Sequence, residues 1–181
     1  MIIAIQGQAG SFHEVAARRL HGEQIRILPC PTFADVFSAV NTGRARHGVV
    51  AIDNTIHGEI TESTDLLKAY KPHIGRDVWL PIELCLIGHP GAKLEDLTKV
   101  YSQGVALAQC QEFFAEYLPT IEQLEHHDTA ASVELIALGE NPAHAAIASS
   151  QAAKHHGMRV LAYGVQDTQD DRTKFITFSI V

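Results

Sequence analysis

The sequence is short of the residues that several functional classes require. Its three cysteines, Cys30, Cys85 and Cys110, are an odd number at wide spacing, without a CxxC pair. This argues against both a disulfide framework and a zinc site built from paired cysteines. All three lie among apolar residues, so we expect buried, reduced thiols.

Positive charge is also scarce. The chain has 14 lysines and arginines against 21 aspartates and glutamates, a formal net charge of -7. Nucleic acids and anionic membranes are bound by basic surfaces that displace counterions or meet lipid headgroups. We therefore expect neither as a partner, and an anionic ligand would need a local positive pocket.

Long hydrophobic runs and metal motifs are missing as well. The apolar start at residues 1–7 has no basic flank and is too short for a signal peptide or a membrane span, so we expect a cytoplasmic protein. Among the eleven histidines, His126-His127 and His155-His156 are adjacent pairs with diverging side chains, and His13-Glu14 lacks the second histidine of HExxH. No metal site is predicted.

The apolar residues follow the spacing of a strand in some segments and the spacing of a helix in others. With 46% hydrophobic residues in 181, the chain can bury the core of one compact unit or of two small lobes. Repeated strand and helix patterns predict parallel sheets with right-handed crossovers. The predicted strands are 2–6, 25–28, 48–52, 100–102, 121–125 and 145–148, and the predicted helices are 15–20, 33–40, 61–69, 105–117, 129–138 and 149–155.

Three further extended segments complete this pattern. Residues 78–87 form a long β-rich stretch that can carry the chain into a second lobe. Residues 159–163 and 173–181 are predicted as two more strands. Apolar residues occupy both faces of the last one, which predicts a central strand.

Three polar clusters follow predicted strands, where open α/β sheets bind ligands. The first, 7–12, opens a helix that Ser11 can cap, and its backbone N–H groups can meet an anion. The second is 53–58, and the third is 102–104 with Gln109 on the following helix. A plain turn and cap explains the first equally well, and an Asx turn explains the second.

Two later clusters are equally open to two interpretations. Asp128 or Thr129 can cap a helix that carries Glu134, and a lone helical glutamate is usually a solvated surface residue. Residues 170–175 place a hydroxyl and two cations before the final strand. A charged loop is the commoner explanation for such a run.

Taken together, the clusters resemble the prephenate dehydratase catalytic domain, in order and over essentially the whole chain. Members of that family carry a GPxGTF-like loop, a PIENS segment followed by a glycine and TxDLL, SHPQALxQC, an STA-type helix and NxTRF. The corresponding segments here are 7–12, 51–55 with Gly58 and 64–67, 102–110, 128–130 and 171–175.

The resemblance implies an α/β fold like the type II periplasmic binding proteins, with two lobes, mostly parallel sheets and a ligand cleft between the lobes. We expect lobe 1 at residues 1–76 plus 160–181 and lobe 2 at 77–159. The implied reaction is the decarboxylating dehydration of prephenate to phenylpyruvate in L-phenylalanine biosynthesis. Aromatisation drives it, so the protein mainly orients the substrate and assists the leaving hydroxyl. The resemblance implies no metal or organic cofactor, and it suggests a homodimer.

The family's functional positions carry over to eleven residues. Thr173 is the hydroxyl that would donate to the departing ring oxygen, and Glu134 falls on a family carboxylate position. The implied substrate-binding residues are Gly10, Ser11, Asp53, Asn54, Thr55, Ser102, Gln109, Lys174 and Phe175.

Several positions depart from the family pattern. Lys174 replaces an arginine and cannot make the bidentate fork that a guanidinium gives a carboxylate. Asp53 replaces glutamate, Asp171 replaces asparagine, and Gln103-Gly104 replaces histidine-proline. The alternative hypothesis is therefore a weak or inactive homologue that acts as a small-carboxylate binding or sensor module. A periplasmic solute receptor with the same fold is disfavoured by the missing signal peptide.

Relatives continue beyond the last motif into an ACT-type domain that binds phenylalanine. These 181 residues do not include that segment. Feedback inhibition through such a domain is not expected from this chain alone.

Overall fold

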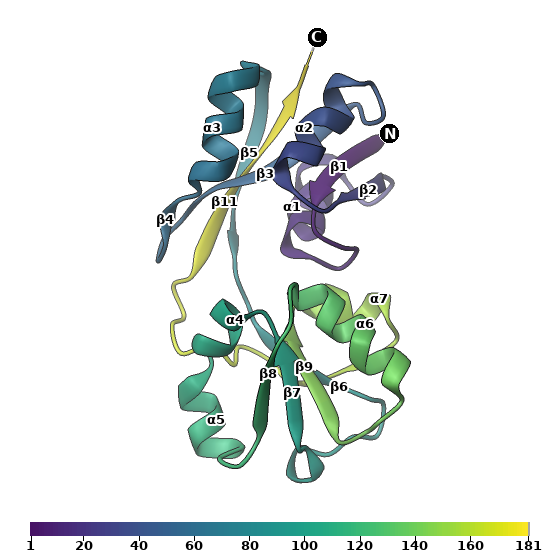
Figure 1. The fold of residues 1–181 in the computed structure, drawn as a ribbon, viewed down its shortest axis with the longest axis vertical. Coiled ribbons are helices and arrows are strands. Elements are labelled where there is room, and N and C mark those ends of the chain that lie inside the picture. Colours follow the sequence, from purple (N-terminus) through teal and green to yellow (C-terminus); the bar gives the residue numbers. More distant parts are fainter. Residues whose placement is uncertain (181) are drawn as a thin grey trace. The chain divides into compact units, whose positions relative to one another are not determined.

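The computed structural model describes residues 1–180 and separates into two compact units (Figure 1). Unit 1 comprises Met1–Ile82 and the segment from Asp170 onward, and unit 2 comprises Glu83–Gln169. These boundaries differ from the predicted lobes, 1–76 plus 160–181 and 77–159. The reason is strand pairing: β5 (His73–Pro81) pairs with β11 (Arg172–Ser179) in unit 1, and β10 (Arg159–Ala162) pairs with β6 (Cys85–Gly88) in unit 2.

Unit 1 is built on a sheet of order β2-β1-β3-β11-β5, with the short β4 paired to β3. β1 is parallel to β2 and β3, whereas β11 is antiparallel to both β3 and β5. β11 lies between two strands, which confirms the predicted central position. The other strands are β1 (Ile2–Gln6), β2 (Arg26–Cys30), β3 (His47–Asn54) and β4 (Gly58–Glu59).

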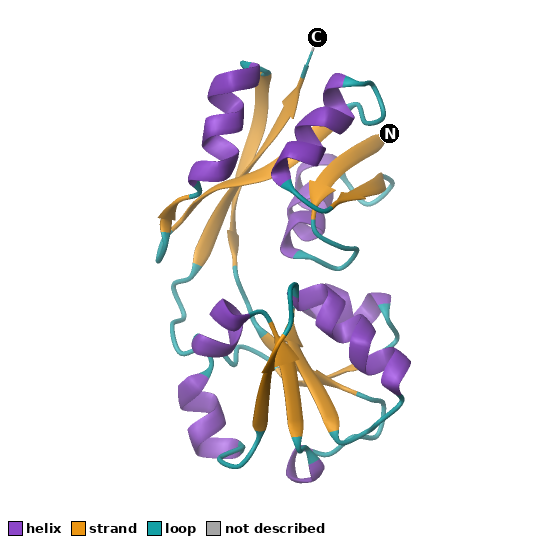
Figure 2. Ribbon diagram, viewed as in Figure 1, coloured by secondary structure: helices purple, strands orange, loops and turns teal. Residues whose placement is uncertain are grey.

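Helices cover both faces of this sheet (Figure 2). α1 (Phe12–His21) packs with one set of core residues, and α2 (Phe33–Asn41) packs with another, while α3 (Thr61–Tyr70) adds Leu66 and Leu67 to the second set. Because side chains alternate along a strand, β11 contributes Phe175 to the α1 side, and Ile176 and Phe178 to the α2 side.

Unit 2 has a second sheet, of order β10-β6-β9-β7-β8. β7 is parallel to β8 and β9, and β6 is antiparallel to β9 and β10. Its remaining elements are β7 (Lys99–Ser102), α4 (Gly104–Ala108), α5 (Gln111–Tyr117), β8 (Glu122–Glu125), α6 (Thr129–Gly139), β9 (His144–Ala148), α7 (Ser150–His155) and a 3₁₀ turn at Leu94–Asp96.

Both sheets are mixed, whereas the resemblance led us to expect mostly parallel ones. The strands before and after each connection between the units account for the difference. β5 runs toward the point where the chain leaves unit 1, and β11 runs away from the point where it returns. The exit and the return lie at the same end of the sheet, where the Ile82 N–H donates to the Asp171 carbonyl, so the two neighbouring strands β5 and β11 are antiparallel. β6 and β10 stand in the same relation in unit 2.

The single helix predicted at 105–117 is two helices, α4 and α5. The break is stabilised from a distant loop, because the Asp167 carboxylate accepts the backbone N–H groups of Gln111 at 3.1 Å and Glu112 at 3.0 Å. The Asp167 N–H in turn donates to the carbonyl of Gln109 at 2.6 Å. Such a cap satisfies the first N–H groups of α5, so the backbone can interrupt the helix there.

All three cysteines are free and buried, as predicted. Burial raises the pKa of the Cys85 thiol to about 11 and that of the Cys110 thiol to about 12. Such thiols stay protonated and unreactive at neutral pH. Among residues 1–180, no helix is both long enough and apolar enough to cross a bilayer.

Close packing of β3 against β11 leads to a first prediction. A Cβ added to Gly48 would overlap the ring of Phe178, which is 1% exposed and stacks on Phe37 with centroids 4.3 Å apart. We expect Gly48→Ala to lower the free energy of unfolding by about 1–3 kcal/mol, because the ring must move. Urea denaturation measures this.

Gly139 provides the matched control. It ends α6, and an added Cβ there meets no atom within 4 Å. Gly139→Ala should be neutral or stabilise by up to about 1 kcal/mol. Equal tolerance of both substitutions would contradict the packing described for Phe178.

Candidate active site

The end of β3 meets the start of β11 at a buried polar cluster in unit 1. The strand register places Asn54 opposite Thr173, and Asp171 lies just before β11. All three are nearly buried, with exposed fractions of 8% for Asn54, 8% for Thr173 and 4% for Asp171. Buried polar groups of this kind require hydrogen-bond partners, and here they find one another.

Asn54 connects the cluster. Its Nδ2 donates to Asp171 Oδ1 at 2.7 Å and to Thr173 Oγ1 at 2.9 Å. Its Oδ1 accepts the backbone N–H groups of Ile56 and His57, both at 2.9 Å. The carboxylate on one side and the two N–H groups on the other fix the orientation of the amide. The Asx turn considered from the sequence and a polar site are therefore both present.

This arrangement determines what the Thr173 hydroxyl can do. Because its oxygen accepts a hydrogen bond from Asn54, its own O–H points along another direction. The Asp171 carboxylate polarises the Asn54 amide from the far side. The chemical result is a hydroxyl that is oriented as a hydrogen-bond donor.

Thr55 joins the two strands just beyond this cluster. Its Oγ1 donates to the carbonyl of Asp170 at 2.9 Å and accepts the N–H of Arg172 at 2.9 Å. The Thr55 backbone N–H also donates to the carbonyl of Arg172, at 2.9 Å. In this structure Thr55 therefore holds the start of β11 beside the end of β3.

Lys174 and Asp53 lie opposite each other in the strand register, on the sheet face away from Thr173. Lys174 Nζ is 3.5 Å from Asp77 Oδ2 and 6.0 Å from the centre of the Trp79 ring. Lys174 also lines a groove of about 470 Å³ on that face, together with Ile52, Leu67, Lys68, Pro72, Ile74, Asp77 and Ile176. The Lys174 ammonium and the Thr173 hydroxyl thus belong to different surroundings.

Phe175 belongs to the core. Its side chain is 1% exposed and meets the ring of His13 edge-on, with centroids 5.0 Å apart. It supports the strand that carries Thr173 instead of lining a surface.

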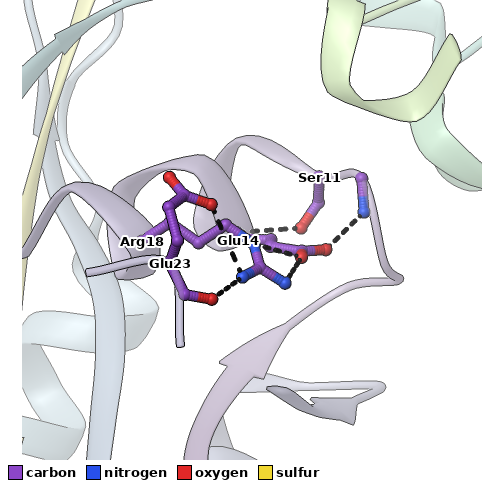
Figure 3. A network of polar contacts seen from close by, with 5 residues as sticks. Ser11, Glu14, Arg18 and Glu23 are labelled. Carbon is purple, nitrogen blue, oxygen red and sulfur yellow. Dashed lines mark hydrogen bonds and ion pairs between the residues drawn. The ribbon is translucent and has the colours of Figure 1, made fainter. Parts of the chain in front are cut away.

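The loop before α1 is held by the buried carboxylate of Glu14 (Figure 3). Glu14 accepts the N–H of Gly10 at 2.7 Å and forms an ion pair with Arg18 at 2.6 Å. Ser11 caps α1, as predicted, by accepting the N–H of Glu14. The Gly10 N–H and the Ser11 Oγ therefore have partners within the loop, and an anion contact at these two residues stays a prediction.

The remaining predicted site residues lie in unit 2. Ser102 is fully buried and donates from Oγ to the carbonyl of Ile147 at 2.7 Å. Gln109 is the C-cap residue that follows α4, and its carbonyl accepts the Asp167 N–H described above. Glu134 is exposed on α6, whose first turn is capped by Asp128, one of the two residues predicted for this cap. The structure therefore gathers Asn54, Thr55 and Thr173 in unit 1, and the roles of the unit 2 residues stay predictions.

Sequence reasoning did not select Asp171 or His13 as site residues. Asp171 stood out only as a departure from the family pattern, and its burial depends on an amide 117 positions away. His13 was considered only for a metal motif. A charge directly before an apolar strand was the one available signal for Asp171, and it is also the signal of an ordinary loop.

A family model described as "Prephenate dehydratase" matches residues 3–180. "Arogenate dehydratase/prephenate dehydratase 6, chloroplastic" from Arabidopsis thaliana is 34% identical over 174 residues, which is 96% of this chain and 42% of the relative. The chain spans less than half the length of the curated relatives it matches.

Two solved structures superpose with a TM-score of 0.89 over 100% of this chain. One is prephenate dehydratase from Arthrobacter aurescens in complex with L-Phe, 29% identical, with 61% of that chain covered. The other is GqqA, described as a novel type of quorum quenching acylase, 30% identical, with 64% of that chain covered.

Fold and comparisons thus define a class, the α/β proteins with the prephenate dehydratase architecture. Within that class the chain belongs to the prephenate dehydratase family, because the family model spans nearly all of it.

The Asn54 network leads to a second prediction. Asn54→Asp would place a second carboxylate beside buried Asp171 and remove both amide donors. Repulsion should raise the pKa of the new carboxyl above its unfolded value, so the folded state retains a proton that the unfolded chain has lost. Relative to the wild type, the free energy of unfolding should therefore fall as the pH rises from 5 to 8, by about 1–3 kcal/mol.

The double variant Asn54→Asp/Asp171→Asn is the control. An amide at position 171 can donate to the new carboxylate, so the pH-dependent loss should largely disappear. Urea denaturation at the two pH values compares the variants. A single variant as stable as the wild type at pH 8 would contradict the network.

Proposed function

We propose that this protein catalyses the decarboxylating dehydration of prephenate to phenylpyruvate, with the Thr173 hydroxyl assisting the leaving group. The observation that carries the proposal is the bond from Asn54 Nδ2 to Thr173 Oγ1, at 2.9 Å, within a buried cluster. Membership of the prephenate dehydratase family supports it.

The reaction needs little from the protein beyond position and one proton donor. The ring carboxylate leaves as CO₂, and the electrons of the broken C–C bond enter the ring. The C–O bond on the far side of the ring breaks, and its oxygen leaves as water after taking up a proton. A threonine hydroxyl is a weak acid, but hydrogen bonding to the departing oxygen stabilises the charge that develops there. Aromatisation supplies the driving force.

The second catalytic residue that we propose is Glu134, on the strength of its family position. The same ground supports Ser102 and Gln109 as substrate contacts. Lys174 is a weaker candidate, because its ammonium faces Asp77 and Trp79. Arg172 is the neighbouring cation: it is exposed and only loosely paired, with its guanidinium 3.7 Å from Asp170 Oδ1. We propose Arg172 as the cation that attracts the anionic substrate.

Arogenate is a second candidate substrate, since the Arabidopsis relative is named for both activities. An acylase activity, named for GqqA, is a further candidate. The Thr173 hydroxyl accepts its hydrogen bond from an amide, whereas an acylase nucleophile needs a base that removes its proton. This contact favours the dehydratase.

We also propose a cytoplasmic location, which the three free, buried thiols fit. A homodimer is proposed from the family resemblance. Size-exclusion chromatography with light scattering tests it.

The third prediction concerns Thr173. With prephenate as substrate and phenylpyruvate followed by absorbance, Thr173→Val should lower kcat by about 10²–10⁴-fold, because it keeps the shape and removes the donor. Thr173→Ser should retain most of the activity. Thr177→Val is the matched control: Thr177 lies on the same strand and face, and its hydroxyl contacts His21 at 2.9 Å instead of Asn54.

A well-folded wild type without turnover of prephenate or arogenate would end the enzymatic proposal. Thermal stabilisation by prephenate without product would then favour the binding or sensor module. Turnover that survives Thr173→Val would keep the enzyme but remove Thr173 from its chemistry.

A further inference from the structure

Along one edge, strand β3 has no strand neighbour between the end of its pairing with β1 at Val49 and the start of its pairing with β4 at Asp53. Pairing of β1 with β3 runs from Ile3 opposite His47 to Ile5 opposite Val49. Ala51, two residues further along, has no β1 residue opposite it in the register, although it is buried. Its backbone groups on that edge need other partners, because unpaired buried N–H and C=O groups are costly.

Two side chains from different helices supply those partners. His13 on α1 accepts the Ala51 N–H at Nε2, at 3.4 Å. Ser63 on α3, which is fully buried, hydrogen-bonds through Oγ to the Ala51 carbonyl. We call His13, Ser63 and the Ala51 backbone the clamp. It takes the place of the missing strand over one residue.

The clamp lies at an irregularity that sets the direction of Asn54. Opposite β11, Lys174 faces Asp53 but Phe175 faces Ala51, so Ile52 is an extra residue in β3. A bulge of this kind bends a strand and redirects the side chains that follow it. Here Asp53 and then Asn54 follow the bulge, and Asn54 holds the Thr173 hydroxyl.

The surroundings of His13 keep its imidazole neutral. The ring lies against Phe33 at 5.6 Å and Phe175 at 5.0 Å between centroids. Burial lowers the pKa of His13 to about 4. A neutral ring can accept at Nε2 only with its proton on Nδ1. Protonation of the ring would add a proton at Nε2, which would then face the Ala51 N–H, donor against donor.

Charged groups on the elements around His13 have other partners or lie on the other sheet face. On α1, Glu14 is paired with Arg18, and on α2, Asp35 bonds to Thr32 in the helix cap. On β11, Lys174 contacts Asp77 on the other sheet face, where Asp53 of β3 also lies. α3 contributes Ser63 to the clamp, and its Asp65 and Lys68 are paired with each other.

We propose that His13 is a positioning residue: its neutral imidazole, together with Ser63, holds the β3 bulge so that Asn54 keeps the Thr173 hydroxyl aligned. This inference rests on the function proposed above. His13 touches no reacting atom in this scheme and acts only through the strand.

The test compares His13→Gln and His13→Leu with the wild type in the full chain. Glutamine is uncharged at every pH and its side-chain oxygen can accept the Ala51 N–H, so activity at pH 7.5 should stay within about threefold of wild type. Leucine cannot accept a hydrogen bond, so the Thr173 hydroxyl should lose its correct placement. We therefore expect kcat to fall about 10- to 100-fold with little change in KM. His89→Gln is the control, since His89 bonds the Ile136 carbonyl in unit 2, and it should match the wild type.

A pH series separates positioning from a merely structural role. The ratio of wild-type to His13→Gln kcat/KM should fall severalfold from pH 7 toward pH 4, because only the wild type loses its acceptor. Titration of the substrate and of other residues cancels in this ratio. A constant ratio, or a His13→Leu variant with full kcat, would overturn the inference.

Hydrogen exchange keeps the two proposals distinguishable. At pH 7 the Ala51 amide should exchange at least about tenfold faster in His13→Leu than in His13→Gln, whether or not the protein turns over prephenate. An inactive wild type with this difference would refute the proposed function and leave the clamp standing. Equal exchange in all variants would refute the clamp while a Thr173-dependent activity could persist.

Discussion

The antiparallel pairing of β3 with β11 is the interaction on which the rest of unit 1 depends. It joins Asn54 to Thr173, which are 119 positions apart in the chain. The same pairing buries Phe175 on one face and Phe178 on the other, so core formation and site formation are one event. A chain that formed its core by pairing β11 elsewhere would have no Asn54–Thr173 contact.

The buried Asp171 shows how this pairing tolerates a charge. A carboxylate removed from water is costly unless it is hydrogen-bonded, and Asn54 provides a 2.7 Å donor. Asn54 can serve both Asp171 and Thr173 because its own oxygen is satisfied by two backbone N–H groups. The replacement of the family asparagine at position 171 is thus accommodated through a neighbour that is still present.

The two faces of the β3–β11 pair have different contents. Thr173 and Asn54 lie on the α1 side, whereas Lys174 and Asp53 face each other on the opposite side. Lys174 and Asp53 are two of the departures from the family pattern, and the register makes them neighbours. Lys174 lines a groove on that side, and the Thr173 hydroxyl takes its hydrogen bond from Asn54 and not from Lys174 or Asp53, so these two departures leave that contact in place.

The sequence by itself determined the order of nearly all helices and strands, the central place of the last strand, the cap at Ser11 and the family motifs. These follow from local periodicity and capping chemistry, which act over a few residues. Only the tertiary structure decided the mixed sheets, the break between α4 and α5 and the burial of Phe175. Each of these depends on a partner far along the chain: Asp167 for the helix break, β5 for the direction of β11, and His13 for the ring of Phe175. Local sequence patterns do not predict such partners, because these depend on which segments become neighbours when the core forms.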